Sequence, residues 1–140
     1  MMALERAFDR LLPLIEGELR QVLHTAQPSL AAYYGMMRYH LGWEDEQFQA
    51  VESNSGKRIR PLLCLLCCEG AGGEAEQALP AAAAVELVHN FSLVHDDIQD
   101  GSRFRRGRPT VWAIWGMPHA INVGDGLFAA RYFLQPPEPW

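Results

Sequence analysis

Apolar residues recur at three- and four-residue spacing along most of the chain, and this period constrains the fold more than any other feature. Leu4, Phe8, Leu11, Ile15 and Leu19 show it first, on one face of a helix. Helices are expected over 2–26 (bent at Pro13), 29–40, 61–70, 75–100, 111–116 and 119–133. Because no segment alternates apolar and polar residues as a half-buried strand would, the sequence predicts an all-α fold with a polar loop at 42–56.

Composition excludes several classes of protein. The 140 residues, 49% of them hydrophobic and 21% charged, suit one folded domain rather than a disordered chain. A net charge of −5 disfavours nucleic acid as a partner, and no apolar run reaches the roughly 18 residues of a membrane span. Cys64, Cys67 and Cys68 lie in one apolar run without a nearby histidine, which disfavours zinc. They indicate buried, reduced thiols in a cytoplasmic protein.

Three aspartates crowd the end of the helix expected at 75–100. At helical spacing His89, Ser92, Asp96 and Asp100 share one face, and Asp97 lies about a quarter-turn away. Carboxylates at a helix C-terminus are disfavoured by the helix dipole. A solvated acidic helix end is the simpler interpretation of this motif alone.

Two basic segments complement the aspartates. Lys57, Arg58 and Arg60 precede the helix expected at Pro61, where the dipole disfavours cations, and Arg103, Arg105, Arg106 and Arg108 follow the aspartates. An arginine run alone is usually solvated surface, and a lone histidine such as His89 is usually a core residue. A magnesium diphosphate relieves both charge clusters, because Mg²⁺ prefers carboxylate and phosphate oxygens and arginine binds phosphate.

These residues resemble the trans-isoprenyl diphosphate synthases, also called polyprenyl synthetases, and among them most closely the geranylgeranyl diphosphate synthases. The resemblance rests on four motifs in order: GKRIRP (56–61), ELVHNFSLVHDDIQD (86–100), RRGRPTVW (105–112) and INVGD (121–125). It implies the isoprenoid synthase fold, an antiparallel helical bundle around a central cavity, in a Mg²⁺-dependent homodimer. Members of the family transfer prenyl groups by condensing isopentenyl diphosphate with an allylic diphosphate.

The resemblance also implies a role for each motif residue. Asp96 and Asp100 would hold Mg²⁺ on the allylic diphosphate, with Asp97 in support and Arg105 contacting that diphosphate. The residues implied for isopentenyl diphosphate are Gly56, Lys57, Arg60, His89 and Arg106. Positive groups would stabilise the departing diphosphate, so the chemistry needs no protein nucleophile.

Two residues before the aspartates bear on product length. A prenyl tail running back along the helix would meet small Ser92 and bulky Phe91. An aromatic residue five positions before an uninterrupted DDIQD resembles the geranylgeranyl diphosphate synthases. Ordinary core packing of Phe91 is the alternative interpretation.

The sequence departs from the family pattern in one respect. Members carry a second aspartate-rich motif on a later helix, whereas Glu138 is the only carboxylate after Asp125. We therefore expect residues 1–140 to be the N-terminal portion of a single isoprenoid synthase domain, inactive alone. The alternatives are a non-catalytic subunit that pairs with a full-length synthase and, least favoured, a stand-alone Mg²⁺–diphosphate binding module.

Overall fold

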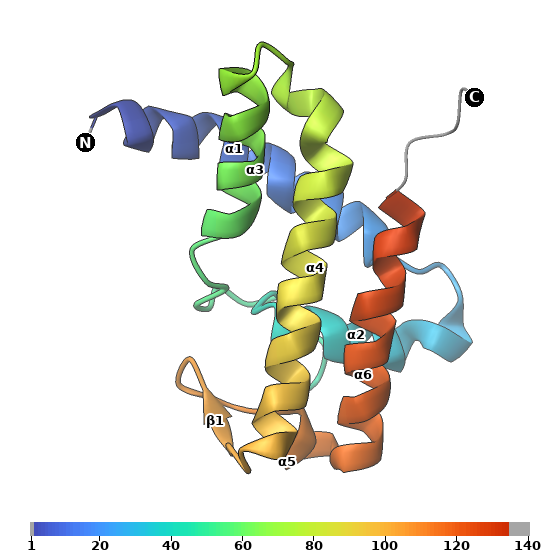
Figure 1. Ribbon diagram of the computed structural model, residues 1–140. Helices are drawn as coiled ribbons and strands as arrows, with labels where there is room; N and C mark the ends of the chain where they lie inside the picture. The colour runs from blue at the N-terminus through green and yellow to red at the C-terminus, as the bar shows by residue number, and fades with distance from the viewer. Residues whose placement is uncertain (1, 135–140) are drawn as a thin grey trace.

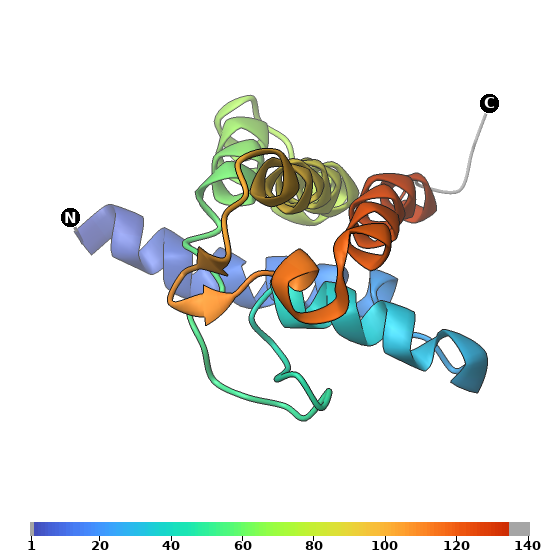
Figure 2. The same ribbon diagram turned by 90° about the horizontal axis from the view of Figure 1, so that it is seen from below.

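Two layers of helices make up the computed structural model, which describes residues 2–134 (Figures 1 and 2). In the first layer the long helix α4 (Ala75–Gln99) lies between α3 (Ile59–Gly70) and α6 (Met117–Ala130). The second layer crosses the first and contains α1 (Met2–Val22) and α2 (Ala31–His40), the latter preceded by a 3₁₀ turn at Pro28–Leu30. The structure thus confirms the expected all-α class.

The core lies where the two layers meet. Leu11, Ile15 and Leu19 of α1 are fully buried, as their spacing predicts, and so are Leu87 and Val94 of α4. Burying one such aliphatic side chain stabilises the fold by about 1.5–3 kcal/mol. The arrangement of helices is therefore set by the apolar stripes that the sequence displays.

Helix boundaries differ from expectation by a few residues. α1 runs through Pro13 but ends at Val22, and α3 begins at Ile59, so that Pro61 lies in its first turn. The last predicted helices are α5 (Val111–Trp115) and α6, which is followed by a 3₁₀ turn at Arg131–Leu134. The proline-containing stretch 135–140, which we expected to end the final helix, lies outside the described residues.

A small β-hairpin, absent from the sequence prediction, follows α4. Strands β1 (Phe104–Arg105) and β2 (Arg108–Pro109) pair antiparallel around the two-residue turn Arg106–Gly107. Both turn residues have positive φ, 52° and 78°, as a type I′ turn requires. Strands of two residues are too short to show alternation, which is why the pattern missed them.

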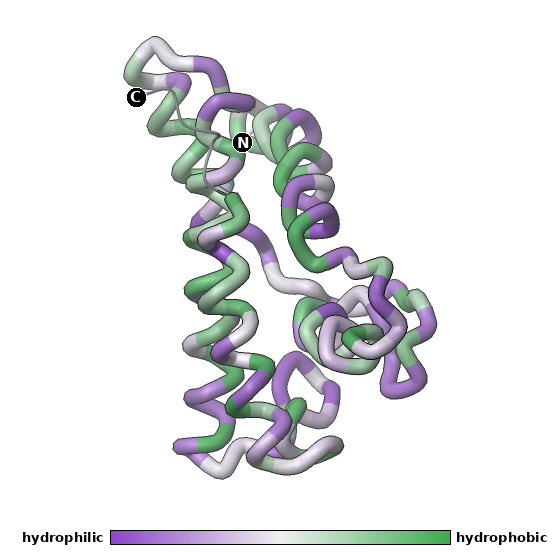
Figure 3. Tube along the Cα trace, turned by 90° about the vertical axis from the view of Figure 1, so that its right-hand side faces the viewer, coloured by the Kyte–Doolittle hydropathy of each residue, from purple (hydrophilic) through white to green (hydrophobic). Residues whose placement is uncertain are grey.

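Hydrophilic segments gather at the end of the molecule where α4 meets the hairpin (Figure 3). Within residues 2–134, no helix has both the length and the apolar character needed to cross a bilayer.

Candidate functional site

The three aspartates at the end of α4 have different surroundings. Asp96 and Asp100 are exposed one helical turn apart, whereas Asp97 is only 3% exposed. Within the described part of the chain, no three side chains of His, Cys, Asp or Glu gather as a complete metal site. Two free carboxylates therefore offer only part of a coordination shell, as suits Mg²⁺ that also binds substrate phosphates.

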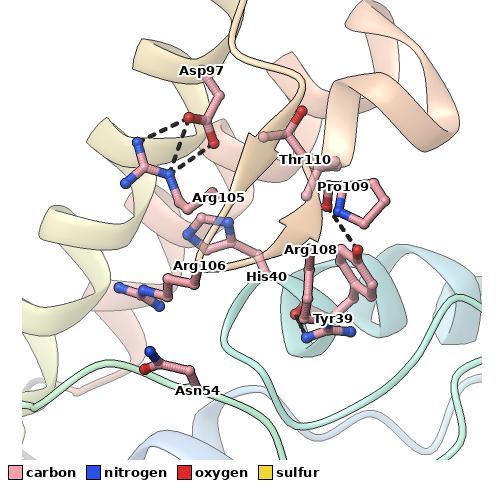
Figure 4. Close-up of a pocket in the computed structure, with 10 residues that line it drawn as sticks. Tyr39, His40, Asn54, Asp97, Arg105, Arg106, Arg108, Pro109 and Thr110 are labelled. Carbon is pink, nitrogen blue, oxygen red and sulfur yellow. Dashed lines mark hydrogen bonds and ion pairs between the residues drawn. The ribbon is translucent and has the colours of Figure 1, made fainter.

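Asp97 is engaged by Arg105 (Figure 4). Arg105 Nε donates to both carboxylate oxygens at 3.0 Å, and Nη2 donates to Oδ1 at 2.9 Å. Because the Asp97 side chain is buried and that of Arg105 is 30% exposed, the pair fixes one edge of the guanidinium and leaves part of it accessible. Asp97 therefore holds Arg105 in one orientation beside the C-terminal end of α4.

Arg106 occupies a strained and partly desolvated position. Its φ of 52° is unusual for a long side chain, and its Nη1 is buried without a hydrogen-bond partner among the described residues. Burial lowers the pKa of Arg106, and the neighbouring positive charge of Arg58 lowers it further. A buried guanidinium nitrogen with an unused donor favours an anionic or water ligand.

The loop before α3 meets the hairpin at Gly56. Its φ is +83°, and a Cβ added there would lie 3.0 Å from Arg106 Nη2. Glycine therefore suits the backbone conformation, and its lack of a Cβ leaves room for the Arg106 guanidinium. The structure brings the first and third motifs into contact, and Lys57 stands exposed beside them.

Arg60 connects α3 to α4. Its Nη1 lies 3.2 Å from Nε2 of His89. Since arginine can only donate, the histidine nitrogen must accept and the ring must be neutral. Consistent with this, burial and the charge of Arg60 lower the pKa of His89.

One residue of the basic segment before α3 has a structural role. Arg58 lies between Lys57 and Arg60 in that segment, but its side chain is 1% exposed and bonds Glu16 Oε1 at 2.7 Å and Glu86 Oε1 at 2.9 Å. The signal in the sequence was Glu86, a single carboxylate in the apolar run AAAAVELV, which needs a buried cationic partner.

Arg108 is a second residue whose role the sequence did not reveal. Its guanidinium stacks on Tyr39 and donates to the backbone oxygens of Tyr39 and Glu44 at 3.2 and 2.6 Å. The hairpin is thereby attached to the end of α2 and to the loop that follows it.

Phe91 and Ser92 lie one turn and more before the aspartates. Phe91 is half-buried and packs against Phe128 of α6, with ring centroids 5.0 Å apart. Ser92 Oγ donates to the backbone oxygen of His89 at 2.7 Å. Packing within the fold thus accounts for Phe91 without reference to a substrate, and its influence on product length stays a prediction.

Known proteins resemble this chain in sequence. Residues 42–135 match the polyprenyl synthetase family. A (2E,6E)-farnesyl diphosphate synthase of Mycobacterium tuberculosis is 47% identical over 119 residues, which are 85% of this chain and 32% of that protein. A geranylgeranyl diphosphate synthase of the same organism is 47% identical over 109 residues, 77% of this chain and 31% of that protein.

Solved structures show the same fold. A polyprenyl synthetase from Streptomyces coelicolor A3(2) superposes with a TM-score of 0.80 at 41% identity, and the match covers 93% of this chain and 36% of that one. A geranylgeranyl pyrophosphate synthetase from Pyrococcus horikoshii Ot3 superposes with a TM-score of 0.76 at 34% identity, and the match covers 94% of this chain and 37% of that one. The chain spans about a third of the length of these relatives. With the fold, the order of motifs and the sequence identity in agreement, the chain belongs to the polyprenyl synthetase family.

Proposed function

We propose that this chain binds the two substrates of a prenyl transfer, an allylic diphosphate and isopentenyl diphosphate, with Mg²⁺ on Asp96 and Asp100. One observation carries the proposal: the loop before α3, the start of α3 and the hairpin converge on the C-terminal half of α4 through the pairs Gly56–Arg106, Arg60–His89 and Arg105–Asp97, two of which join residues about 30 and 50 positions apart in the sequence. Opposite charges are concentrated there, and within residues 2–134 Asp96, Asp100 and Lys57 are exposed without an ion-pair partner.

The residues present fit the chemistry. Bound between exposed Asp96 and Asp100 and the substrate, Mg²⁺ would supply positive charge that stabilises the departing diphosphate. Arg105, held by Asp97, would supply further positive charge to that diphosphate through donors that need no reorganisation. Lys57, Arg60, Arg106 and neutral His89 would hold isopentenyl diphosphate, whose double bond attacks the allylic carbon as the carbon–oxygen bond to diphosphate breaks. A proton then leaves the new prenyl chain, with diphosphate as the acceptor.

We propose geranylgeranyl diphosphate as the product, in line with Phe91 and the uninterrupted DDIQD. Relatives of equal identity carry the names farnesyl and geranylgeranyl diphosphate synthase, so their names do not decide the length. The test is a chimera that joins residues 1–134 to the remaining part of the M. tuberculosis farnesyl diphosphate synthase. Phe91→Ala should lengthen its product, and an unchanged product would remove Phe91 from the argument.

We also propose that the chain works with a second polypeptide segment or subunit rather than alone, with a homodimer as the family's usual assembly. Two free carboxylates make up only part of a metal site within the described residues, and apolar Met117, Ile121 and Phe133 are exposed along α6 and the turn after it. In the alternative, the chain is a non-catalytic subunit that binds its partner through the same exposed apolar residues, and the partner carries out prenyl transfer. Two measurements separate these possibilities: gel filtration of the chain mixed with a full-length synthase, and product analysis of the chimera. A stable complex together with an inactive chimera favours the non-catalytic subunit.

Selective loss of each substrate tests the assignment of the two diphosphate sites. Lys57→Ala and Arg60→Ala should each weaken isopentenyl diphosphate about tenfold or more in calorimetry while leaving geranyl diphosphate within about threefold. Arg105→Ala should show the reverse pattern. Equal losses for both substrates in all three variants would contradict the assignment.

A further inference from the structure

His40, the last residue of α2, lies behind the two consecutive arginines of the hairpin. Figure 4 shows its imidazole between the side chains of Arg105 and Arg106, with Asn54 on the far side of Arg106. None of the motifs that relate the chain to its family includes this position.

Three buried polar atoms around His40 lack hydrogen-bond partners among the described residues: His40 Nε2, Arg106 Nη1 and Asn90 Oδ1. Neither Nε2 of His40 nor Nη1 of Arg106 has a hydrogen bond among the described residues, although both atoms are inaccessible to solvent. Both side chains line the same cavity of about 20 Å³, together with Asp97, Asn54 and Arg105. A space of this size holds one water molecule, and unpaired polar atoms on its wall favour such a water.

The charge of His40 decides which bonds it can make. Burial lowers the pKa of His40 to about 3, the positive charges of Arg106 and Arg105 act in the same direction, and a side-chain interaction with Asn90 opposes them only in part. The ring is therefore neutral near pH 7, and one of its nitrogens can accept a hydrogen bond. Arg106 offers only donors, so the two groups are complementary through a water that accepts from Nη1 and donates to Nε2.

We propose that His40 is a positioning residue for Arg106, holding the guanidinium through one buried water so that its remaining donors face the diphosphate site. His40 itself does not touch substrate. The structural part of this inference stands on the cavity and its two unpaired atoms, and only its effect on diphosphate binding rests on the proposed function.

Three variants of the full 140-residue chain test it. His40→Gln keeps a neutral acceptor, His40→Phe keeps a ring without one, and His24→Phe makes the same change at an exposed histidine. Nitrogen-15 NMR of the histidine rings and arginine side chains reports the tautomer of His40 and the exchange of the Arg106 Nη hydrogens. Calorimetry with inorganic diphosphate reports binding.

The expected results depend on whether the side chain at position 40 offers a hydrogen-bond acceptor to the buried water. Wild-type His40 should be neutral with Nε2 unprotonated, and the Arg106 Nη hydrogens should exchange slowly in wild type and His40→Gln but rapidly in His40→Phe. Diphosphate affinity should fall about tenfold in His40→Phe and stay within about threefold in His40→Gln and His24→Phe.

A protonated Nε2 in wild type, or an Arg106 signal that His40→Phe does not change, would overturn the inference. Should His40→Phe fail to fold, the wild-type ring spectrum and His40→Gln still decide it. If wild type binds no diphosphate at all, the proposed function fails at this site, and the NMR results decide the contact between His40 and Arg106 independently.

Discussion

Arg106 is the residue at which folding and ligand binding conflict most clearly. Its left-handed backbone costs about 1–2 kcal/mol relative to a residue suited to φ of 52°. Its buried Nη1 adds the cost of an unmade hydrogen bond. Strain of this kind is stored at functional sites, where the side chain is needed for its chemistry rather than for stability.

Replacing Arg106 with Asn should therefore stabilise the fold and weaken diphosphate binding. Asn-Gly is the pair that a type I′ turn prefers, so we expect the free energy of unfolding to rise by about 1 kcal/mol in urea denaturation. Affinity for isopentenyl diphosphate should fall at least about tenfold, because a charged donor is lost.

Arg103→Asn is the matched control, since Arg103 is exposed and does not have positive φ. It should change neither stability nor affinity appreciably. A destabilised Arg106→Asn variant would show that the contacts of the guanidinium stabilise the fold by more than the positive φ at Arg106 destabilises it.

The two histidines near the site make stability depend on pH. The pKa of His40 is lowered to about 3 and that of His89 is also lowered, so the unfolded chain binds more protons below about pH 6.5. Stability should be fully present above pH 6.5 and decrease toward pH 5, by up to about 1.4 kcal/mol per pH unit for His40. Urea denaturation at pH 7 and pH 5 measures this, and His40→Gln should flatten the dependence. An unchanged dependence in that variant would contradict a neutral, buried His40.

Sequence reasoning located most of the residues at the site but not their contacts. Helical spacing separates Asp97 from the face that Asp96 and Asp100 share, yet its pairing with Arg105 depends on the hairpin. Arg58 and Lys57 are adjacent in the sequence with the same charge, but one is buried and the other exposed, because only Arg58 meets Glu16 and Glu86. Such differences arise from tertiary contacts over dozens of residues and leave no local pattern.

At the scale of elements, Arg58 joins three helices at the start of α3. It bonds Glu16 of α1 and Glu86 of α4, and Glu86 Oε1 also accepts from Asn90 Nδ2 at 2.9 Å. Since Gly56 and Lys57 precede Arg58 directly, this buried network fixes the loop that carries them.

Arg58→Met should destabilise the fold by about 3–5 kcal/mol, because it leaves the Glu86 carboxylate buried without its counter-charge. Arg10→Met is the control: Arg10 forms an equally short bidentate pair with Glu69, but at the surface. Solvent screens such a pair, so its loss should leave the unfolding midpoint nearly unchanged. Similar losses of unfolding free energy in the two variants would contradict the claim that burial makes the Arg58 pair the more important one for stability.

The helices were predictable because apolar periodicity extends over many residues, whereas short elements were not. Residues 75–100 were expected as one helix and α4 covers Ala75–Gln99, despite Pro80 within it. The hairpin depends on two positive φ angles, one of them at an arginine, which no propensity predicts. Likewise α1 ends at Val22, before the polar residues that we had included in the helix.

At the scale of the whole molecule, the two layers bring opposite charges to one end of α4. At this end of α4, Arg105 of the hairpin pairs with Asp97, whereas Asp96 and Asp100 are exposed. Arg60 of α3 contacts His89 of the same helix. Among the described residues only Asp97 of the three aspartates has an arginine partner, so Asp96 and Asp100 stay available for the metal that we propose.

The most direct test is whether Mg²⁺ and diphosphate bind cooperatively through Asp96 and Asp100. Calorimetry of geranyl diphosphate with the chain should show tighter binding in the presence of Mg²⁺. The double variant Asp96→Asn, Asp100→Asn should lose that gain while keeping binding through the arginines. Asp9→Asn, an exposed carboxylate on α1, should behave as wild type. An equal Mg²⁺-dependent gain in the double variant would contradict the account, because the metal would then bind elsewhere.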